Sequence, residues 1–166
     1  MIPLFLGLTL TNLLCLALTT LLGYLSVHGH PLRQTHVLIG ALSTLVCVGV
    51  HCVVFTYFNA TAKWVQHAVM VKKLDPSLTA PTRSFKRQAF PAALLAMAST
   101  FAAAMYGAAL DNFMVSRDAH TIAAIVALAI NVIVAGVEFR AISRNGRLID
   151  SILAKIGPGE RDATIV

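Results

Sequence analysis

Three histidines stand where they could bind a cofactor or carry a proton inside an apolar protein. His36 and His120 lie near the start of two long apolar runs, and His51 lies well inside the first of those runs. Neutral imidazole is a common ligand of transition metals and of haem iron. An ionisable side chain deep in a membrane span is a candidate functional residue by default. These three residues are therefore the first candidates for chemistry.

The first hypothesis for the histidines is a haem site. If both runs are helices, His36 and His120 lie at the same depth near one membrane surface, where two imidazoles can ligate one iron from opposite sides. His51 lies roughly 22 Å deeper along its helix and is a further candidate ligand without an evident partner. In outline the chain resembles a four-helix membrane cytochrome b subunit, which implies haem b as the cofactor and electron transfer as the function.

The second hypothesis gives the histidines no cofactor. His36 and His120 would then be interfacial residues beside lipid headgroups, and His51 would donate or accept an interhelical hydrogen bond. The polar residues expected inside the spans are Asn12, His51, Asn131 and Glu138. His51 and Glu138 also suit a proton path, so a small transporter or proton-conducting protein is a further alternative.

Motifs for catalysis are missing from the sequence. There is no Ser-His-Asp order, H-E-x-x-H motif, phosphate-binding loop or pair of intramembrane carboxylates. His28, His30 and His36 form an H-x-H-x5-H pattern without a nearby cysteine or carboxylate, so no metal site is predicted. We do not expect an enzyme acting on its own. The first functional expectation is a non-catalytic subunit or scaffold of a larger membrane complex, with other membrane subunits or a second copy as partners.

The composition is that of a membrane protein. The chain has 166 residues, of which 57% are hydrophobic and 12% are charged, and its mean hydropathy is +0.77. Soluble domains carry about twice this share of charge. The net charge of +6 does not indicate nucleic acid, because the basic residues flank apolar runs and form no patch with aromatic residues. The lipid bilayer is the predicted environment.

Four apolar runs are long enough to cross a bilayer as helices. They cover about residues 2–27, 35–59, 88–110 and 120–139. The second run continues as a helix to Leu74, because apolar residues recur at steps of three and four as far as Asp75 and Pro76. The predicted fold is an all-α four-helix transmembrane bundle over residues 1–147, with the long second helix extending into the cytoplasm.

The segments around the spans complete the prediction. Residues 75–87 are expected to form a surface loop, and Asn145-Gly146 is expected to end the fourth helix. Residues 148–166 then form a short amphipathic helix on the membrane surface and a flexible tail. The two halves of the chain resemble each other only as hydrophobic hairpins, so no internal repeat is predicted.

The basic residues predict the orientation in the membrane. Only Arg33 and Arg117 lie on the side of the first and third connections. The other side carries eleven basic residues, namely Lys63, Lys72, Lys73, Arg83, Lys86, Arg87, Arg140, Arg144, Arg147, Lys155 and Arg161. Since the more basic side faces the cytoplasm, both termini are expected there, in a bacterial-type inner membrane.

Overall fold

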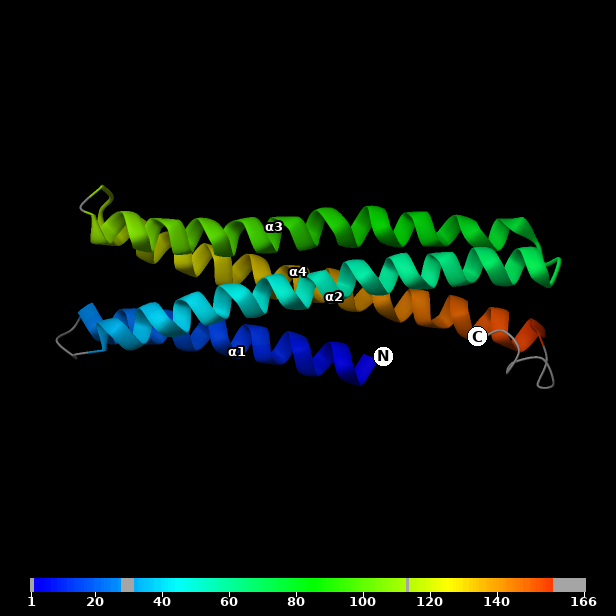
Figure 1. Cartoon of the computed structure of the whole chain (residues 1–166), viewed down its shortest axis with the longest axis horizontal. Coiled ribbons are helices and arrows are strands. Elements are labelled where there is room, and N and C mark those ends of the chain that lie inside the picture. The colour runs from blue at the N-terminus through cyan, green and yellow to red at the C-terminus, as the bar shows by residue number, and fades with distance from the viewer. Residues whose placement is uncertain (1, 28–31, 113, 157–166) are drawn as a thin grey trace.

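The computed structural model describes residues 2–27, 32–112 and 114–156, which form four long α-helices and one short 3-10 helix (Figure 1). The elements in chain order are α1 (Ile2–Val27), α2 (Arg33–Val71), η1 (Pro76–Thr79), α3 (Ala80–Asp111) and α4 (Arg117–Ile156). The prediction of an all-α protein is confirmed.

All four helices are long and apolar enough to cross a membrane. The most apolar window in each has a mean hydropathy between 1.6 and 2.4. Large apolar side chains face outward along them, such as Leu38 at 69%, Leu45 at 70% and Ile133 at 66% exposed. A continuous apolar exterior of this kind would be unfavourable in water but suits lipid. The length and composition of the helices therefore agree with a membrane protein.

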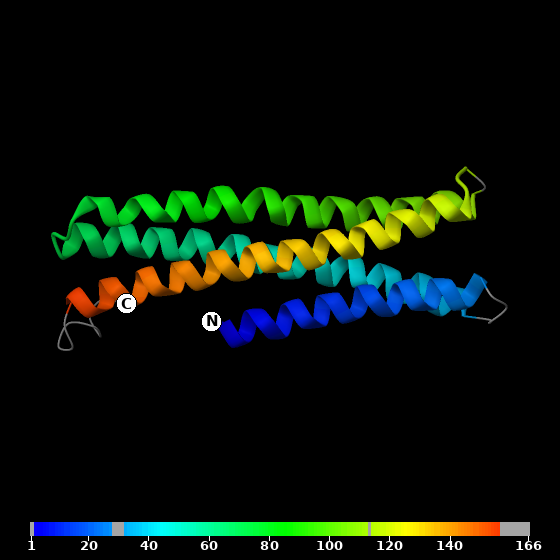
Figure 2. The same cartoon turned by 180° about the vertical axis from the view of Figure 1, so that it is seen from behind.

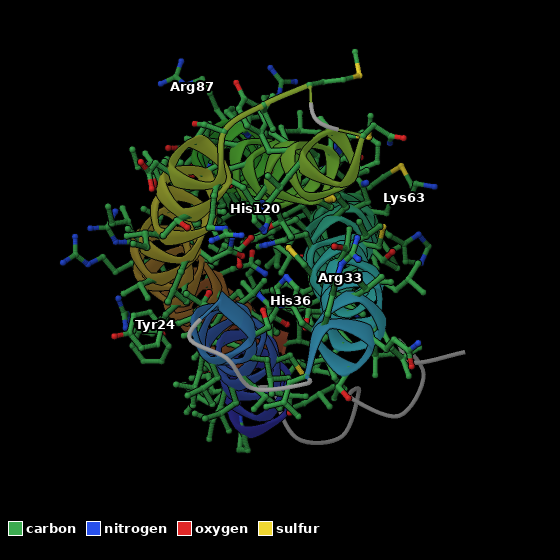
Figure 3. The ribbon with its side chains drawn as sticks, turned by 90° about the vertical axis from the view of Figure 1, so that its left-hand side faces the viewer. Tyr24, Arg33, His36, Lys63, Arg87 and His120 are labelled. Carbon is green, nitrogen blue, oxygen red and sulfur yellow. The ribbon has the colours of Figure 1, made fainter. Side chains whose placement is uncertain are left out.

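The helices form two antiparallel hairpins, α1–α2 and α3–α4, whose connections lie at the same end of the bundle (Figures 1 and 2). Viewed along the bundle, α2 lies between α1 and α3, and α4 lies between α3 and α1 (Figure 3). The helices α2 and α4 are therefore diagonally opposite each other. Small residues allow close packing between the hairpins, and Ala89, Ala93 and Ala96 of α3 are fully buried.

The second helix is long, as predicted, but it does not extend alone. It contains 39 residues and runs well past the N-terminal end of α1, side by side with α3 and α4 (Figures 1 and 2). Val65, Ala68 and Val69 of α2 pack there against Ile152 and Ile156 of α4. The part of the bundle beyond α1 is thus a three-helix extension with its own apolar core.

The predicted end of the fourth helix at Asn145-Gly146 is wrong, and so is the separate amphipathic helix on the membrane surface. The helix α4 continues without a break to Ile156 and has 40 residues. Asn145 is only 1% exposed, and its Nδ2 donates to Tyr57 Oη and Thr61 Oγ1, each at 3.0 Å. These bonds to α2 hold the Asn145 side-chain amide inside the bundle. Ile152, which belongs to the predicted amphipathic helix, packs against α2 and does not face lipid. The predicted flexible tail from Gly157 lies outside the described residues.

The predicted surface loop over residues 75–87 is also mostly helical. Asp75 caps η1, where the Ser77 amide donates to Asp75 Oδ1 at 2.9 Å and holds the pKa of that carboxyl below its usual value. The helix α3 then begins at Ala80, because Pro81 is compatible with a first helical turn. Phe85 anchors this early start by packing into the apolar core beside Phe58 and Ala141.

Candidate functional site

A cavity of about 790 Å³ lies inside the bundle at the end that carries the two hairpin connections. All four helices line it, with Thr19 from α1, His36 from α2, Thr100 from α3 and His120 from α4. We call it the histidine cavity, after His36 and His120. Its walls are otherwise mostly small residues, including Gly40, Ala103, Ala104, Gly107, Ala124 and Ala127.

The structure brings His36 and His120 together, as the shared depth of the two residues predicts. They come from the diagonal helices α2 and α4, and both lie between the helices in the view along the bundle (Figure 3). The centroids of their rings are 6.0 Å apart, with an interplanar angle of 69°. If each ring nitrogen lay about 2 Å from a shared metal, the ring centroids would be roughly 6 Å apart. The observed separation matches this value.

The hydrogen bond of His36 determines which of its ring nitrogens carries the proton. His36 Nδ1 lies 3.0 Å from the backbone carbonyl oxygen of Thr19. A carbonyl oxygen only accepts hydrogen bonds, so Nδ1 carries the proton and Nε2 keeps its lone pair. Metal-ligating histidines commonly donate their other ring nitrogen to a carbonyl in this way. His36 therefore already has the tautomer that an axial ligand needs.

Each histidine ring packs against a glycine of the neighbouring helix in its own hairpin. A Cβ atom added to Gly23 would lie 2.9 Å from His36 Cε1, and one added to Gly107 would lie 3.0 Å from His120 Cε1. Any larger residue would displace the ring, so the two glycines determine how close each imidazole comes to its neighbouring backbone. Sequence reasoning did not identify Gly23, although the same distance along the chain separates Gly107 from His120.

His51 is placed differently from the other two histidines. Its Nδ1 lies 2.8 Å from Glu138 Oε1, and the two residues are 2% and 1% exposed. It does not line the histidine cavity. Of the other polar residues expected inside the spans, Asn12, Asn131 and Glu138, it is Glu138 that forms a hydrogen bond with His51. The hydrogen bond between His51 and Glu138 joins the diagonal helices α2 and α4.

Asn131 joins three helices beneath the cavity. Its Nδ2 donates to Thr100 Oγ1 at 3.0 Å and to the Ala127 carbonyl at 2.9 Å, and its Oδ1 accepts from Asn12 Nδ2 at 3.1 Å. Cys47 Sγ lies 3.5 Å from both Thr100 Oγ1 and Asn131 Oδ1. These bonds form a polar floor under the histidine cavity. Thr100 and Cys47 carried no signal in the sequence that distinguished them from packing residues.

Metal binding by protein side chains alone has no support in the described part of the chain. Residues 2–27, 32–112 and 114–156 contain no group of three or more histidine, cysteine, aspartate or glutamate side chains that could hold an ion. His28 and His30 of the H-x-H-x5-H pattern lie outside these ranges. His36 and His120 alone supply two of the three or four protein donors that such an ion usually has.

Comparison of the chain with protein-family models, with curated proteins and with solved structures finds no match. The functional assignment therefore rests on the geometry of the histidine cavity.

Proposed function

We propose that this protein is a membrane-bound electron carrier that holds one b-type haem in the histidine cavity, with His36 and His120 as the two axial ligands. The observation that carries the proposal is the opposition of the two imidazoles at 6.0 Å across a cavity between diagonal helices. Edge-to-face aromatic pairs occur at similar separations, so the distance counts only together with the cavity and the tautomer of His36.

The residues around the cavity suit a flat macrocycle. The volume of about 790 Å³ falls in the range of sites that bury an organic ligand or cofactor. The glycine and alanine residues on the walls have little or no side chain, so a planar ring can approach the helix backbones. The hydrogen bond between Nδ1 and the Thr19 carbonyl orients the His36 ring. When bound, haem iron would supply a one-electron redox couple, and the polar floor around Asn131 would hold the cavity's inner wall in place.

The sequence-based expectation of a subunit or scaffold without a cofactor stays a prediction, as does that of a small transporter or proton-conducting protein. An electron carrier without other catalytic groups still needs proteins that deliver and accept electrons. We therefore keep other membrane subunits or a second copy as the proposed partners. The electron carrier differs from both alternatives in one measurable property, since it alone binds haem.

The test is the absorbance spectrum of the purified protein, as isolated and after addition of haem, in the oxidised and the dithionite-reduced state. We expect a Soret band that shifts on reduction and a sharp α-band in the reduced protein, because two strong-field imidazoles give low-spin iron. If the Soret band of the protein does not shift on reduction and no sharp α-band appears after haem addition, the scaffold hypothesis would replace this one.

We propose that both termini face the cytoplasm, which places the histidine cavity near the outer face of the membrane. The uneven distribution of basic residues supports this orientation. In a variant that lacks the native cysteines, a cysteine at Asn112 should react with an impermeant maleimide in intact cells. A cysteine at Ser77, at the opposite end of the bundle, should react only after permeabilisation. The reverse labelling pattern would invert the orientation.

A further inference from the structure

The two hairpins carry the same three residues around the histidine cavity at a constant offset. Gly23, Arg33 and His36 of the first hairpin correspond to Gly107, Arg117 and His120 of the second. The offset is 84 residues in each case, from 23 to 107, from 33 to 117 and from 36 to 120. The expectation that the halves match only as hydrophobic hairpins is therefore wrong at this end of the bundle.

Six of the ten buried positions of α2 have a buried counterpart in α4 at the same offset. The pairs Ser43 and Ala127, Cys47 and Asn131, Val50 and Val134, Val54 and Glu138, Phe58 and Ile142, and Ala68 and Ile152 are all buried. The residue types differ within most pairs, which hides the repeat in the sequence. Both connections lie at one end of the bundle (Figure 1), and α1, α2, α3 and α4 follow one another around it (Figure 3), so the two hairpins are arranged as an approximate two-fold axis along the bundle would place them.

Arg33 and Arg117 lie one helical turn from the two histidines, on the side of the hairpin connections. Each is the first residue of its helix, and both line the histidine cavity. The partial positive charge of a helix N-terminus adds to that of each guanidinium group. The acidic side chain nearest in sequence is Asp118, in the first turn of α4. The end of the cavity beside the hairpin connections therefore carries two cationic groups, one from each hairpin.

We infer that Arg33 and Arg117 bind the two carboxylates of the ligand that His36 and His120 coordinate, one arginine to each carboxylate. The inference rests on the proposed function and specifies the chemical class of the ligand, a tetrapyrrole with two free acid groups on one edge. That edge would face the hairpin connections. Guanidinium and carboxylate groups match each other in bidentate geometry and form strong charge-assisted hydrogen bonds.

Symmetry is the reason to assign both arginines to one ligand. In a dicarboxylate porphyrin, a two-fold axis that runs in the ring plane through the metal and between the acid groups exchanges the two acid groups. The same operation exchanges the two axial positions. In the protein, the offset of 84 residues pairs Arg33 with Arg117 and His36 with His120, and all four residues line the histidine cavity. One placement of the ligand therefore satisfies all four residues.

The experiment compares haem with haem dimethyl ester, in which both acid groups are masked. The purified full-length protein is titrated with each compound as wild type, as Arg33→Gln, as Arg117→Gln and as the double variant. Each single substitution should weaken haem binding about ten-fold, the value of one charge-assisted interaction, and should leave binding of the ester within about two-fold. The control is Arg147→Gln, an exposed arginine of α4 far from the cavity, which should bind both compounds as the wild type does.

The possible results separate the two proposals. Equal wild-type affinities for haem and its ester, or equal losses for both compounds in the arginine variants, would overturn the carboxylate assignment and leave the histidine site intact. Failure of the wild type to bind either compound would overturn the histidine site and this assignment with it. A low-spin spectrum in the haem-saturated double variant provides the check that its cavity is folded, so that a lower affinity can be assigned to the arginines.

Discussion

Replacement of His120 with alanine is expected to remove the low-spin spectrum of the haem-loaded protein and to weaken haem binding by at least about 100-fold. Loss of residues that only support a metal ligand already costs 10- to 100-fold in affinity, and His120 would be a ligand itself. His36→Ala should have the same effect, because both residues would bind the same iron. The measurement is a titration with haem that is monitored by absorbance in the oxidised and in the reduced state.

The matched control for these variants is His67→Ala. His67 also belongs to α2, but it is exposed and lies outside the histidine cavity, so its loss should change nothing. Added imidazole should enter the space vacated in His120→Ala and restore the low-spin spectrum, which a misfolded variant could not do. An unchanged spectrum in His36→Ala or His120→Ala would remove that residue from the site.

Replacement of His51 with alanine is expected to destabilise the fold by about 3–5 kcal/mol, the usual cost when one partner of a buried ion pair is removed. Glu138 is 1% exposed, and without the 2.8 Å hydrogen bond to His51 Nδ1 its carboxyl group would be buried without that partner. The double variant His51→Leu with Glu138→Leu should recover most of this loss, because no polar group of the pair then remains buried. Reversible unfolding in detergent, followed by circular dichroism, measures the free energies.

The His51→Ala variant also tests whether His51 is a further haem ligand, as the haem hypothesis drawn from the sequence allows. The structure places it outside the lining of the histidine cavity, so His51→Ala should keep the oxidised and reduced spectra of the wild type while its stability falls. A double variant that is no more stable than His51→Ala would contradict the pairing of His51 with Glu138. A lost low-spin spectrum in a folded His51→Ala protein would instead support ligation by His51.

Much of the fold is encoded in local properties of the sequence. The first span matches the observed helix α1, because a bilayer core requires about 20 apolar residues and the apolar run defines them. The shared depth of His36 and His120 follows from the same spans. Ser116 directly precedes the first residue of α4, and its Oγ accepts from the Ala119 amide at 3.2 Å, as is common for a serine at this position.

The remaining features depend on contacts between helices. Asn145-Gly146 has the local pattern of a helix end, but Tyr57 and Thr61 of α2 satisfy the Asn145 side chain and the helix continues. Gly23 lies beside His36 only because α1 packs against α2. Thr100 belongs to the cavity floor through a bond to a residue 31 positions away. No local sequence pattern specifies such pairs.

The central claim is that His36 and His120 ligate one iron, and electron paramagnetic resonance of the oxidised, haem-loaded wild type tests it most directly, together with near-infrared magnetic circular dichroism. We predict a low-spin ferric signal with the charge-transfer band of two imidazole ligands, at one haem per chain. A high-spin signal, or a band that indicates only one histidine ligand, would contradict the claim.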